Sequence, residues 1–363
     1  MKKATVYIGF LIVSTFFPAG YGVAAQAADR VAVIPLLGGA VGNATAADVV
    51  KGKTFSSRTA GKGVTGTLEL PPCAQTYTNS IGMTFHFLPA GGFTMGSPAM
   101  EPGGPYNDET QHAVQLHAFY MQTTEVTNKQ WNDIVVVPNI GVNPSSSHAD
   151  DSYPVENVNW FEAAYFANIL SAREGLSQCY IFSGCNGQAL GTGMTCASVT
   201  FRDPCTGYRL PTEAQWEYAA RATTTTPWAY AYHYDYSANP GQVISEDFNS
   251  NLDAMAWYAW NDGLTGGYSM GTKPVAKKQA NKWGLFDMHG NVWEWCQDWY
   301  GDYPSGGSIS RDPQGPATGI ERVARGGYWE SSAGAARVAN REKTSPDIRA
   351  MTIGFRLVLP TAP

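Results

Sequence analysis

Six cysteines are the residues of this sequence whose chemistry is easiest to assign. Four of them fall within one short polar segment, at Cys179, Cys185, Cys196 and Cys205. No C-x2-C spacing occurs, so a zinc site is the weaker of two interpretations. In an exported chain the same grouping indicates an insertion pinned by disulfides, and the sequence leaves the three pairings open. Cys73 and Cys296 lie outside this group and either pair with each other or stay free.

The six histidines do not form a recognisable catalytic or metal site. They are scattered along the chain, and His112 and His117 would lie on opposite faces of a strand. Neither a Ser-His-Asp order nor a Gly-rich phosphate loop stands out. We therefore interpret the histidines as structural.

The first 27 residues have the pattern of a secretory signal peptide. Lys2 and Lys3 precede an apolar stretch, Val6 to Phe17, and residues 25–27 offer small side chains for cleavage. That stretch is too short to span a bilayer, and no other segment approaches the roughly 20 apolar residues that a span needs. We expect an exported chain without a membrane span, located in the periplasm, at the cell surface or in the medium.

Composition predicts one large, loop-rich domain with a short appendage. The chain has 39 Gly and 22 Pro among 363 residues, and its net charge of −6 argues against nucleic acid as a partner. Residues 28–72 form a small N-terminal module or stalk in this interpretation. The prolines at 71 and 72 mark a boundary, so the main domain is expected at 73–363.

The main domain shows short strand-like runs interrupted by a few helices. Helices are expected to begin at Thr127, Asn159 and Thr212, because Glu or Gln follows each of these capping residues by three positions. The runs after Gly82 alternate with turn residues, as short antiparallel strands do. This pattern predicts an α+β domain.

Five sequence blocks between about residues 82 and 358 carry a family resemblance. They are EVTNKQW at 125–131, RLPTEAQWEYAAR at 209–221, NKWGLFDMHGNVWEW at 281–295, RGGYW at 325–329 and GFR at 354–356. In this order they resemble the formylglycine-generating enzyme, or sulfatase-modifying factor, family. The resemblance implies a C-type-lectin-like α+β fold with short antiparallel strands, few helices and long loops.

The cysteines that perform the oxidation in that family are missing. The family carries two copper-binding cysteines just after the RGG motif, whereas the segment from Tyr328 to Arg337 contains none. Cu(I) is a soft ion that needs thiolate ligands. We therefore expect neither copper nor formylglycine-generating activity, and favour a protein that is not an enzyme.

The same resemblance implies a calcium site in the NKWGLFDMHGNVWEW block. The matching positions are Asp287, Gly290, Val292 and Glu294. Carboxylates and loop carbonyls are the hard oxygen ligands that Ca²⁺ prefers. The alternative is a tight turn in which Glu294 only bonds to the backbone.

Residues 325–356, which we call the last block, also resemble the variable proteins of diversity-generating retroelements, which display a ligand-binding face on this fold. The matching framework positions are Arg325, Gly326, Gly327, Trp329, Arg337, Asn340, Arg341, Gly354, Phe355 and Arg356. Between them lie the candidate ligand-binding positions, Tyr328, Glu330, Ser331, Ser332, Glu342, Lys343, Thr344 and Met351. A rigid scaffold presenting such loops is the arrangement expected of a recognition module.

The sequence therefore predicts an exported, non-catalytic binding protein whose ligand is a surface protein or a glycan. Two alternatives stay open. One is a periplasmic or secreted oxidoreductase, acting on a small molecule or a protein, with a pocket near Trp293, Glu294, Trp329 and Arg337. The other is a structural component of an envelope or appendage, which only the N-terminal module suggests.

Overall fold

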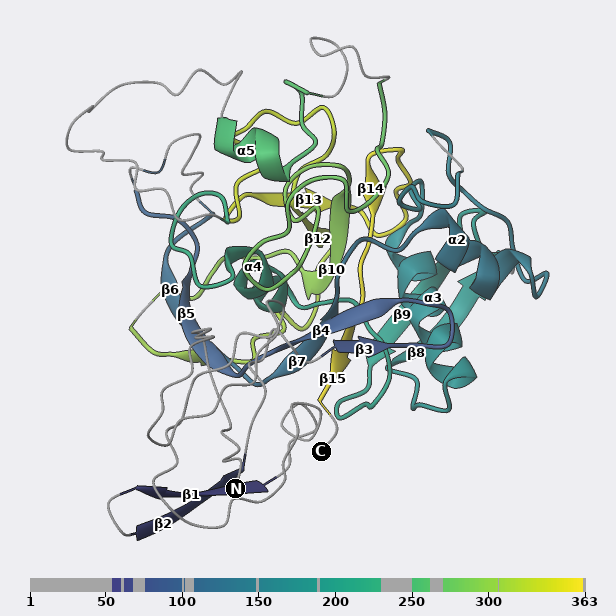
Figure 1. Ribbon diagram of the computed structural model, residues 1–363. Coiled ribbons are helices and arrows are strands. Elements are labelled where there is room, and N and C mark those ends of the chain that lie inside the picture. The colour runs from purple at the N-terminus through teal and green to yellow at the C-terminus, as the bar shows by residue number, and fades with distance from the viewer. Residues whose placement is uncertain are drawn as a thin grey trace. The chain divides into compact units, whose positions relative to one another are not determined.

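The computed structural model describes residues 54–59, 62–67, 76–99, 101, 108–147, 150–187, 190–229, 250–261, 270–305 and 307–361 (Figure 1). The chain divides into two compact units, Met1–Ala74 and Gln75–Pro363. The predicted signal peptide and most of the predicted N-terminal module lie outside the described residues. In the first unit, β1 (Thr54–Thr59) and β2 (Lys62–Thr67) pair as an antiparallel hairpin.

A four-stranded sheet lies at the centre of the second unit. Its order is β13 (Arg341–Thr344), β12 (Arg322–Arg325), β10 (Trp293–Trp299) and β14 (Ile353–Gly354). The pairs β13–β12 and β12–β10 are antiparallel, whereas β10 and β14 are parallel. In β10 the first six residues are buried, as expected of a strand covered on both faces.

The second unit contains three further sheets. The first has the order β15 (Val358–Pro360), β7 (Phe119–Gln122), β4 (Thr84–Leu88) and β3 (Thr76–Thr78). The second has the order β11 (Ser310–Arg311), β6 (His112–Leu116) and β5 (Gly91–Met95). The third is the hairpin of β8 (Tyr180–Asn186) and β9 (Thr195–Phe201).

The helices begin where their capping residues predict. The boxes at Thr127, Asn159 and Thr212 are all formed, and they open α2 (Asn128–Trp131), α3 (Trp160–Arg173) and α4 (Glu213–Arg221). After α2 the chain widens into a π-helical turn, η2 (Asn132–Val136), which the sequence analysis did not anticipate. A further short helix, α5 (Ser250–Met255), was not expected either. The predicted α+β class is confirmed, and none of the described helices is long and apolar enough to cross a membrane.

Two disulfides decide among the pairings that the sequence left open. Cys179 joins Cys205, and Cys185 joins Cys196 across the β8–β9 hairpin. These bonds favour the disulfide interpretation of the four cysteines over zinc. Cys296 is a free and buried thiol, and Cys73 lies outside the described residues.

Candidate functional site

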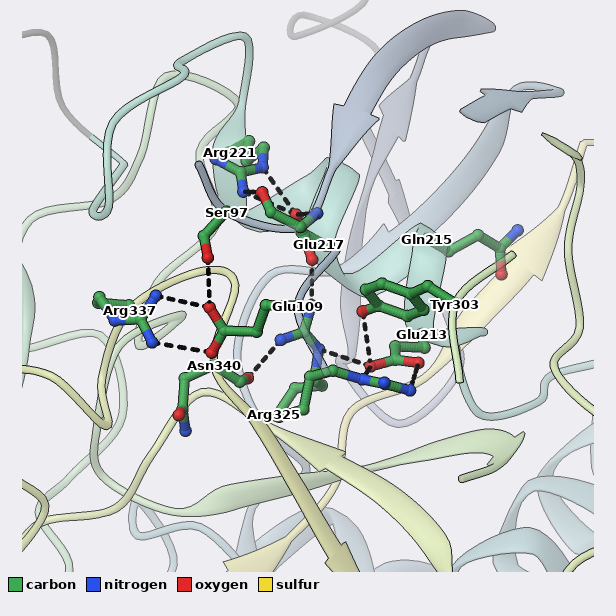
Figure 2. Close-up of polar contacts among 12 residues, drawn as sticks. Ser97, Glu109, Glu213, Gln215, Glu217, Arg221, Tyr303, Arg325, Arg337 and Asn340 are labelled. Atoms are coloured by element: carbon green, nitrogen blue, oxygen red, sulfur yellow. Dashed lines mark hydrogen bonds and ion pairs between the residues drawn. The ribbon is translucent and has the colours of Figure 1, made fainter. Parts of the chain in front are cut away.

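Buried ion pairs hold the last block of the chain against α4 and the loops before β6 (Figure 2). Arg325 is fully buried, and its Nη2 donates to a carboxylate oxygen of Glu217. The other oxygen of Glu217 accepts from Arg221 Nη2 at 2.7 Å and from the Gly96 amide at 2.9 Å. Burial alone would raise the pKa of Glu217, but Arg221 and Arg325 outweigh burial and keep that pKa below its ordinary value. The carboxylate therefore stays ionised.

Arg337 binds two carboxylates that come from a distant part of the sequence. Its Nη2 lies 2.8 Å from Glu109 Oε1, and its Nη1 lies 2.7 Å from Glu101 Oε1. Ser97 completes the site, since its hydroxyl donates to Glu109 Oε2 at 2.6 Å. Burial opposes the charge on Arg337, yet the hydrogen bonds and charges of the two glutamates raise its pKa above the ordinary value. These contacts fix the middle of the segment between β12 and β13.

Two further arginines complete the framework. Arg341 binds Glu213 with two parallel contacts, Nε to Oε1 at 2.7 Å and Nη2 to Oε2 at 2.9 Å. Arg356 binds Glu294 in the same bidentate manner, at 2.7 and 2.6 Å. Trp216 Nε1 donates to Glu294 Oε2 at 2.7 Å, so both oxygens of Glu294 are already engaged.

The two glycines of the RGG motif are required by backbone geometry. Gly326 and Gly327 have φ values of 101° and 81°, a region that residues with a Cβ rarely adopt. A Cβ on Gly326 would also lie 3.0 Å from the Trp216 ring. These glycines turn the chain out of β12 immediately after Arg325.

The predicted ligand-binding positions differ in exposure. Glu330, Ser332 and Met351 are exposed, and Tyr328 is half-buried. Ser331 is buried instead, because its hydroxyl accepts from the Tyr328 amide at 2.9 Å and its carbonyl accepts from the Ala259 amide. Ser331 therefore belongs to the turn, and its side chain does not face solvent.

Sheet register divides the exposed positions into two groups. Glu294 pairs with Arg325 and Trp293 pairs with Ile353, so the chain leaving β12 and the chain entering β14 meet at the same end of the sheet. We call the positions at this end, Tyr328, Glu330, Ser332 and Met351, the end face. Glu342 and Lys343 instead lie on the edge strand β13, opposite Ala324 and Val323, and we call them the edge pair.

The remaining candidate, Thr344, lies beyond the edge pair. It is opposite Arg322, at the far end of β13, and is half-buried. Lys343 leans away from the end face as well, with its Nζ 3.9 Å from Glu321 and 5.2 Å from the Tyr300 ring centroid. The eight positions therefore do not form one continuous surface.

The proposed calcium ligands are also only partly available. Asp287 is buried at φ 56°, and its Oδ2 accepts from the Ala276 amide at 2.7 Å. Its Oδ1 is buried without a hydrogen-bond partner among the described residues. Glu294 is occupied by Arg356 and Trp216, so its carboxylate does not fit the role that the family resemblance gives it.

Glu125 is a carboxylate that the sequence analysis did not select. Its Oε1 accepts from Asn291 Nδ2 at 3.0 Å, while its Oε2 is buried and has no partner among the described residues. Burial first, and the neighbouring Asp287 second, raise the pKa of Glu125 well above its ordinary value. Burial likewise raises the pKa of Asp287 to about 6. Two such carboxylates side by side form an acceptor pair that suits a hard cation.

The structure describes no group of three or more His, Cys, Asp or Glu side chains arranged to hold a metal ion. Any cation at Glu125 and Asp287 would therefore need backbone carbonyls, such as those predicted at Gly290 and Val292, to complete its shell. Glu125 is the first residue of the EVTNKQW block, but 162 residues separate it from Asp287 in the sequence. Only the fold brings the two carboxyl groups together.

Comparison with known proteins identifies the family. The model of the sulfatase-modifying factor enzyme 1-like domain matches residues 74–361. The chain belongs to this family. It is 31% identical over 290 residues to a formylglycine-generating enzyme of Streptomyces coelicolor, covering 74% of this chain and 87% of that enzyme. It is also 31% identical over 267 residues to the chaperone protein LppX of Paenibacillus barcinonensis, covering 70% of this chain and 83% of that protein.

A solved structure extends the comparison to three dimensions. Treponema denticola variable protein 1 superposes with a TM-score of 0.62 at 32% sequence identity, over 79% of this chain and 99% of that one. These matches confirm both resemblances stated from the sequence blocks and the C-type-lectin-like fold they implied. The end face therefore lies on a scaffold that this chain shares with the two relatives and with the variable protein.

Proposed function

We propose that this chain is a non-catalytic, exported binding protein that recognises a surface protein or a glycan through the end face. The observation that carries the proposal is the contrast between a buried framework held by ion pairs and the exposed side chains placed between its members. Arg325, Arg337 and Arg356 are each fully buried with carboxylate partners, whereas Glu330 and Met351 are exposed on the connecting segments.

Such a framework supports recognition because it limits the entropy lost on binding. Each arginine ties the last block to a different part of the fold, through Glu217 on α4, Glu109 before β6 and Glu294 on β10. A segment held at three points loses less conformational freedom when a ligand arrives than a free loop would. The similarity to a variable protein of Treponema denticola supports a display role for the same face.

The chemistry of the last block supports binding over oxidation. No cysteine occurs after Cys296, and this thiol is buried, with a pKa that burial raises well above its ordinary value. A protonated, enclosed thiol is a poor ligand for Cu(I). Glu294 and Arg337, which the oxidoreductase hypothesis placed in a pocket, are instead paired with Arg356 and Glu109.

Calcium is the cofactor that the fold family implies, and the proposal assigns it to Asp287 and Glu125. Their unpartnered oxygens fit a hard divalent cation, whereas Glu294 does not. When bound, the cation would supply positive charge between two buried carboxylates and would cross-link the segment before β10 to the loop before α2. Arg356 and Lys278 add positive charge near Asp287, so we expect a weak site suited to extracellular calcium.

The proposal is tested by an array of glycans and cell-surface proteins, probed with the mature chain in calcium and in chelator. An end-face variant, Tyr328→Ala with Glu330→Gln and Met351→Ala, is compared with an edge-pair variant, Glu342→Gln with Lys343→Gln. Both sets of positions lie on the surface of the same framework, so the edge-pair variant is a matched control.

Binding that the end-face variant loses and the edge-pair variant keeps would support the proposal. Binding that both variants keep would place recognition elsewhere. If no probe is bound and the wild-type chain consumes oxygen with a small-molecule or protein substrate, the oxidoreductase alternative would replace it.

A further inference from the structure

A cavity of about 470 Å³ lies between the β8–β9 hairpin and the sheet that contains β7 and β15, and none of the end-face or edge-pair residues lines it. Its apolar wall includes Leu116, Phe119, Phe201 and Pro360. Gln215, Gln297 and Gln314 contribute polar groups, and the half-buried Arg209 contributes a cation to the lining. The lining thus combines apolar side chains with polar and charged ones, as a site for a small ligand with an apolar body and a polar end requires.

The backbone of Arg209 is fixed in place. Its amide donates to the Val358 carbonyl at 3.0 Å, and its carbonyl accepts from the Val358 amide at 2.8 Å. The guanidinium uses Nη1 for two contacts, with the Leu210 carbonyl at 3.1 Å and Gln215 Oε1 at 2.8 Å. Within the described ranges Nε and Nη2 make no hydrogen bond, so one edge of the guanidinium remains for a ligand.

Arg209 differs from the framework arginines in its charge environment. Arg325, Arg337, Arg341 and Arg356 each meet a carboxylate within 3 Å, whereas Arg209 has no carboxylate within ion-pair distance among the described residues. Burial, the largest influence, lowers the pKa of Arg209. A guanidinium that is partly withdrawn from water and has no carboxylate in direct contact carries a desolvation cost that a bound anion would offset.

The rest of the cavity restricts the kind of anion. Asp203 and Asp312 carry negative charge close to Arg209, and each has its own partner, Gln314 Nε2 at 3.3 Å and His117 Nδ1 at 2.6 Å. Their charge disfavours a dianion such as phosphate more than a singly charged group. The apolar wall favours a ligand whose body is apolar.

We propose that this cavity binds a monocarboxylate with an apolar or aromatic body. The carboxylate would accept two parallel hydrogen bonds from Nε and Nη2 of Arg209, and the body would pack against Phe201 and Leu116. The carboxylate could belong to a free acid or to the C-terminus of a peptide, which share this chemistry. The site is independent of the end face, so it stands or falls separately from the proposed function.

The test uses the whole chain and defined probes in isothermal titration calorimetry. N-acetylphenylalanine is compared with N-acetylphenylalanine amide and with phenyl phosphate. A five-residue peptide ending in phenylalanine, with a free or an amidated C-terminus, shows whether the cavity also admits a peptide end. Arg209→Gln is the test variant, and Arg202→Gln, at an exposed arginine directly after β9, is its matched control.

We expect the free acid to bind more tightly than the amide and the phosphate, and Arg209→Gln to weaken it by about 10-fold to 100-fold, the ratio for a charged hydrogen-bonded pair. Arg202→Gln should leave the affinity unchanged. If Arg209→Gln does not fold, Phe201→Ala becomes the test variant. It must weaken the binding of the free acid while its melting temperature stays close to that of the wild type. Equal binding of acid and amide, no binding of any carboxylate, or binding that neither variant weakens would overturn the proposal.

Discussion

Buried charge is balanced around the last block and unbalanced at Glu125 and Asp287. In the last block every buried arginine meets a carboxylate within 3 Å, as Arg341 and Arg356 do. At the second place two buried carboxylates lie side by side, and each keeps an oxygen without a partner among the described residues. Because burial raises the pKa of Glu125 and of Asp287, ionising them without a nearby cation is costly, so the first region is best understood as framework and the second as a place for a cation.

Removal of one framework arginine should have the largest effect on stability. Arg337→Met leaves Glu101 and Glu109 buried without their guanidinium, so we expect the free energy of unfolding to fall by about 3–5 kcal/mol. Urea denaturation followed by tryptophan fluorescence measures the change. The control is Lys129→Met, which breaks an exposed pair with Asp133 and should change stability far less. Similar losses in both variants would show that the last block is not held by this ion pair.

Calcium should stabilise the chain through the unbalanced region. At a calcium concentration about 100 times the dissociation constant, the gain in unfolding free energy is expected to be about 2.7 kcal/mol. Asp287→Asn and Glu125→Gln should each abolish that gain, while Asp302→Asn, at an exposed position, should keep it. In chelator, Asp287→Asn should be at least as stable as the wild type, because it removes a buried carboxylate that lacks a cation.

The same experiment tests which glutamate binds calcium together with Asp287. We propose Glu125, whereas the family resemblance implies Glu294. Glu294→Gln should destabilise the chain with or without calcium, since it breaks the pair with Arg356, but should keep the calcium-dependent gain. If Glu294→Gln lost the calcium-dependent gain in unfolding free energy and Glu125→Gln kept it, Glu294 would be the calcium ligand and Glu125 would not. Thermal melts of the four variants in calcium and in chelator distinguish the two outcomes.

Replacement of Asp298 should have a smaller effect, which appears in the pH dependence of the unfolding free energy. Burial, then the charge of Glu213, raises the pKa of Asp298 to about 7, from about 3.9 in the unfolded chain. Between these values the folded state holds a proton that the unfolded state has released, so stability falls as pH rises from about 4 to about 7. Asp298→Asn should make this slope less negative, by up to about 1.4 kcal/mol per pH unit. Urea midpoints at pH 5, 6 and 7 measure the slope, and identical slopes in the variant and wild type would contradict the assignment.

Local features of the fold could be predicted from the sequence, because their causes lie within a few residues. The capping boxes at Thr127, Asn159 and Thr212 each join residues three positions apart, and all three are formed. The disulfide-pinned insertion was predicted from the clustering of four cysteines, although the pairing needed the structure. The π-helical turn at Asn132–Val136 has no comparable local signal.

The site was harder to predict, because its partners are distant in sequence. Arg337 and Glu109 are 228 residues apart, and only the fold shows that they pair. The burial of Ser331 follows from a turn that hydrogen-bonds to Tyr328 and Ala259 rather than from residue type. Family resemblance identified the family and its sequence blocks, but it could not show that Arg356 pairs with Glu294 or that Glu125 lies beside Asp287.

The most direct test of the central claim is the dissociation constant of the strongest array probe for wild-type chain, end-face variant and edge-pair variant. Biolayer interferometry in saturating calcium would measure all three under the same conditions. Our account predicts that the end-face variant loses binding at least about tenfold, a change of about 1.4 kcal/mol, while the edge-pair variant stays close to the wild type. Equal affinities of the three proteins would contradict it.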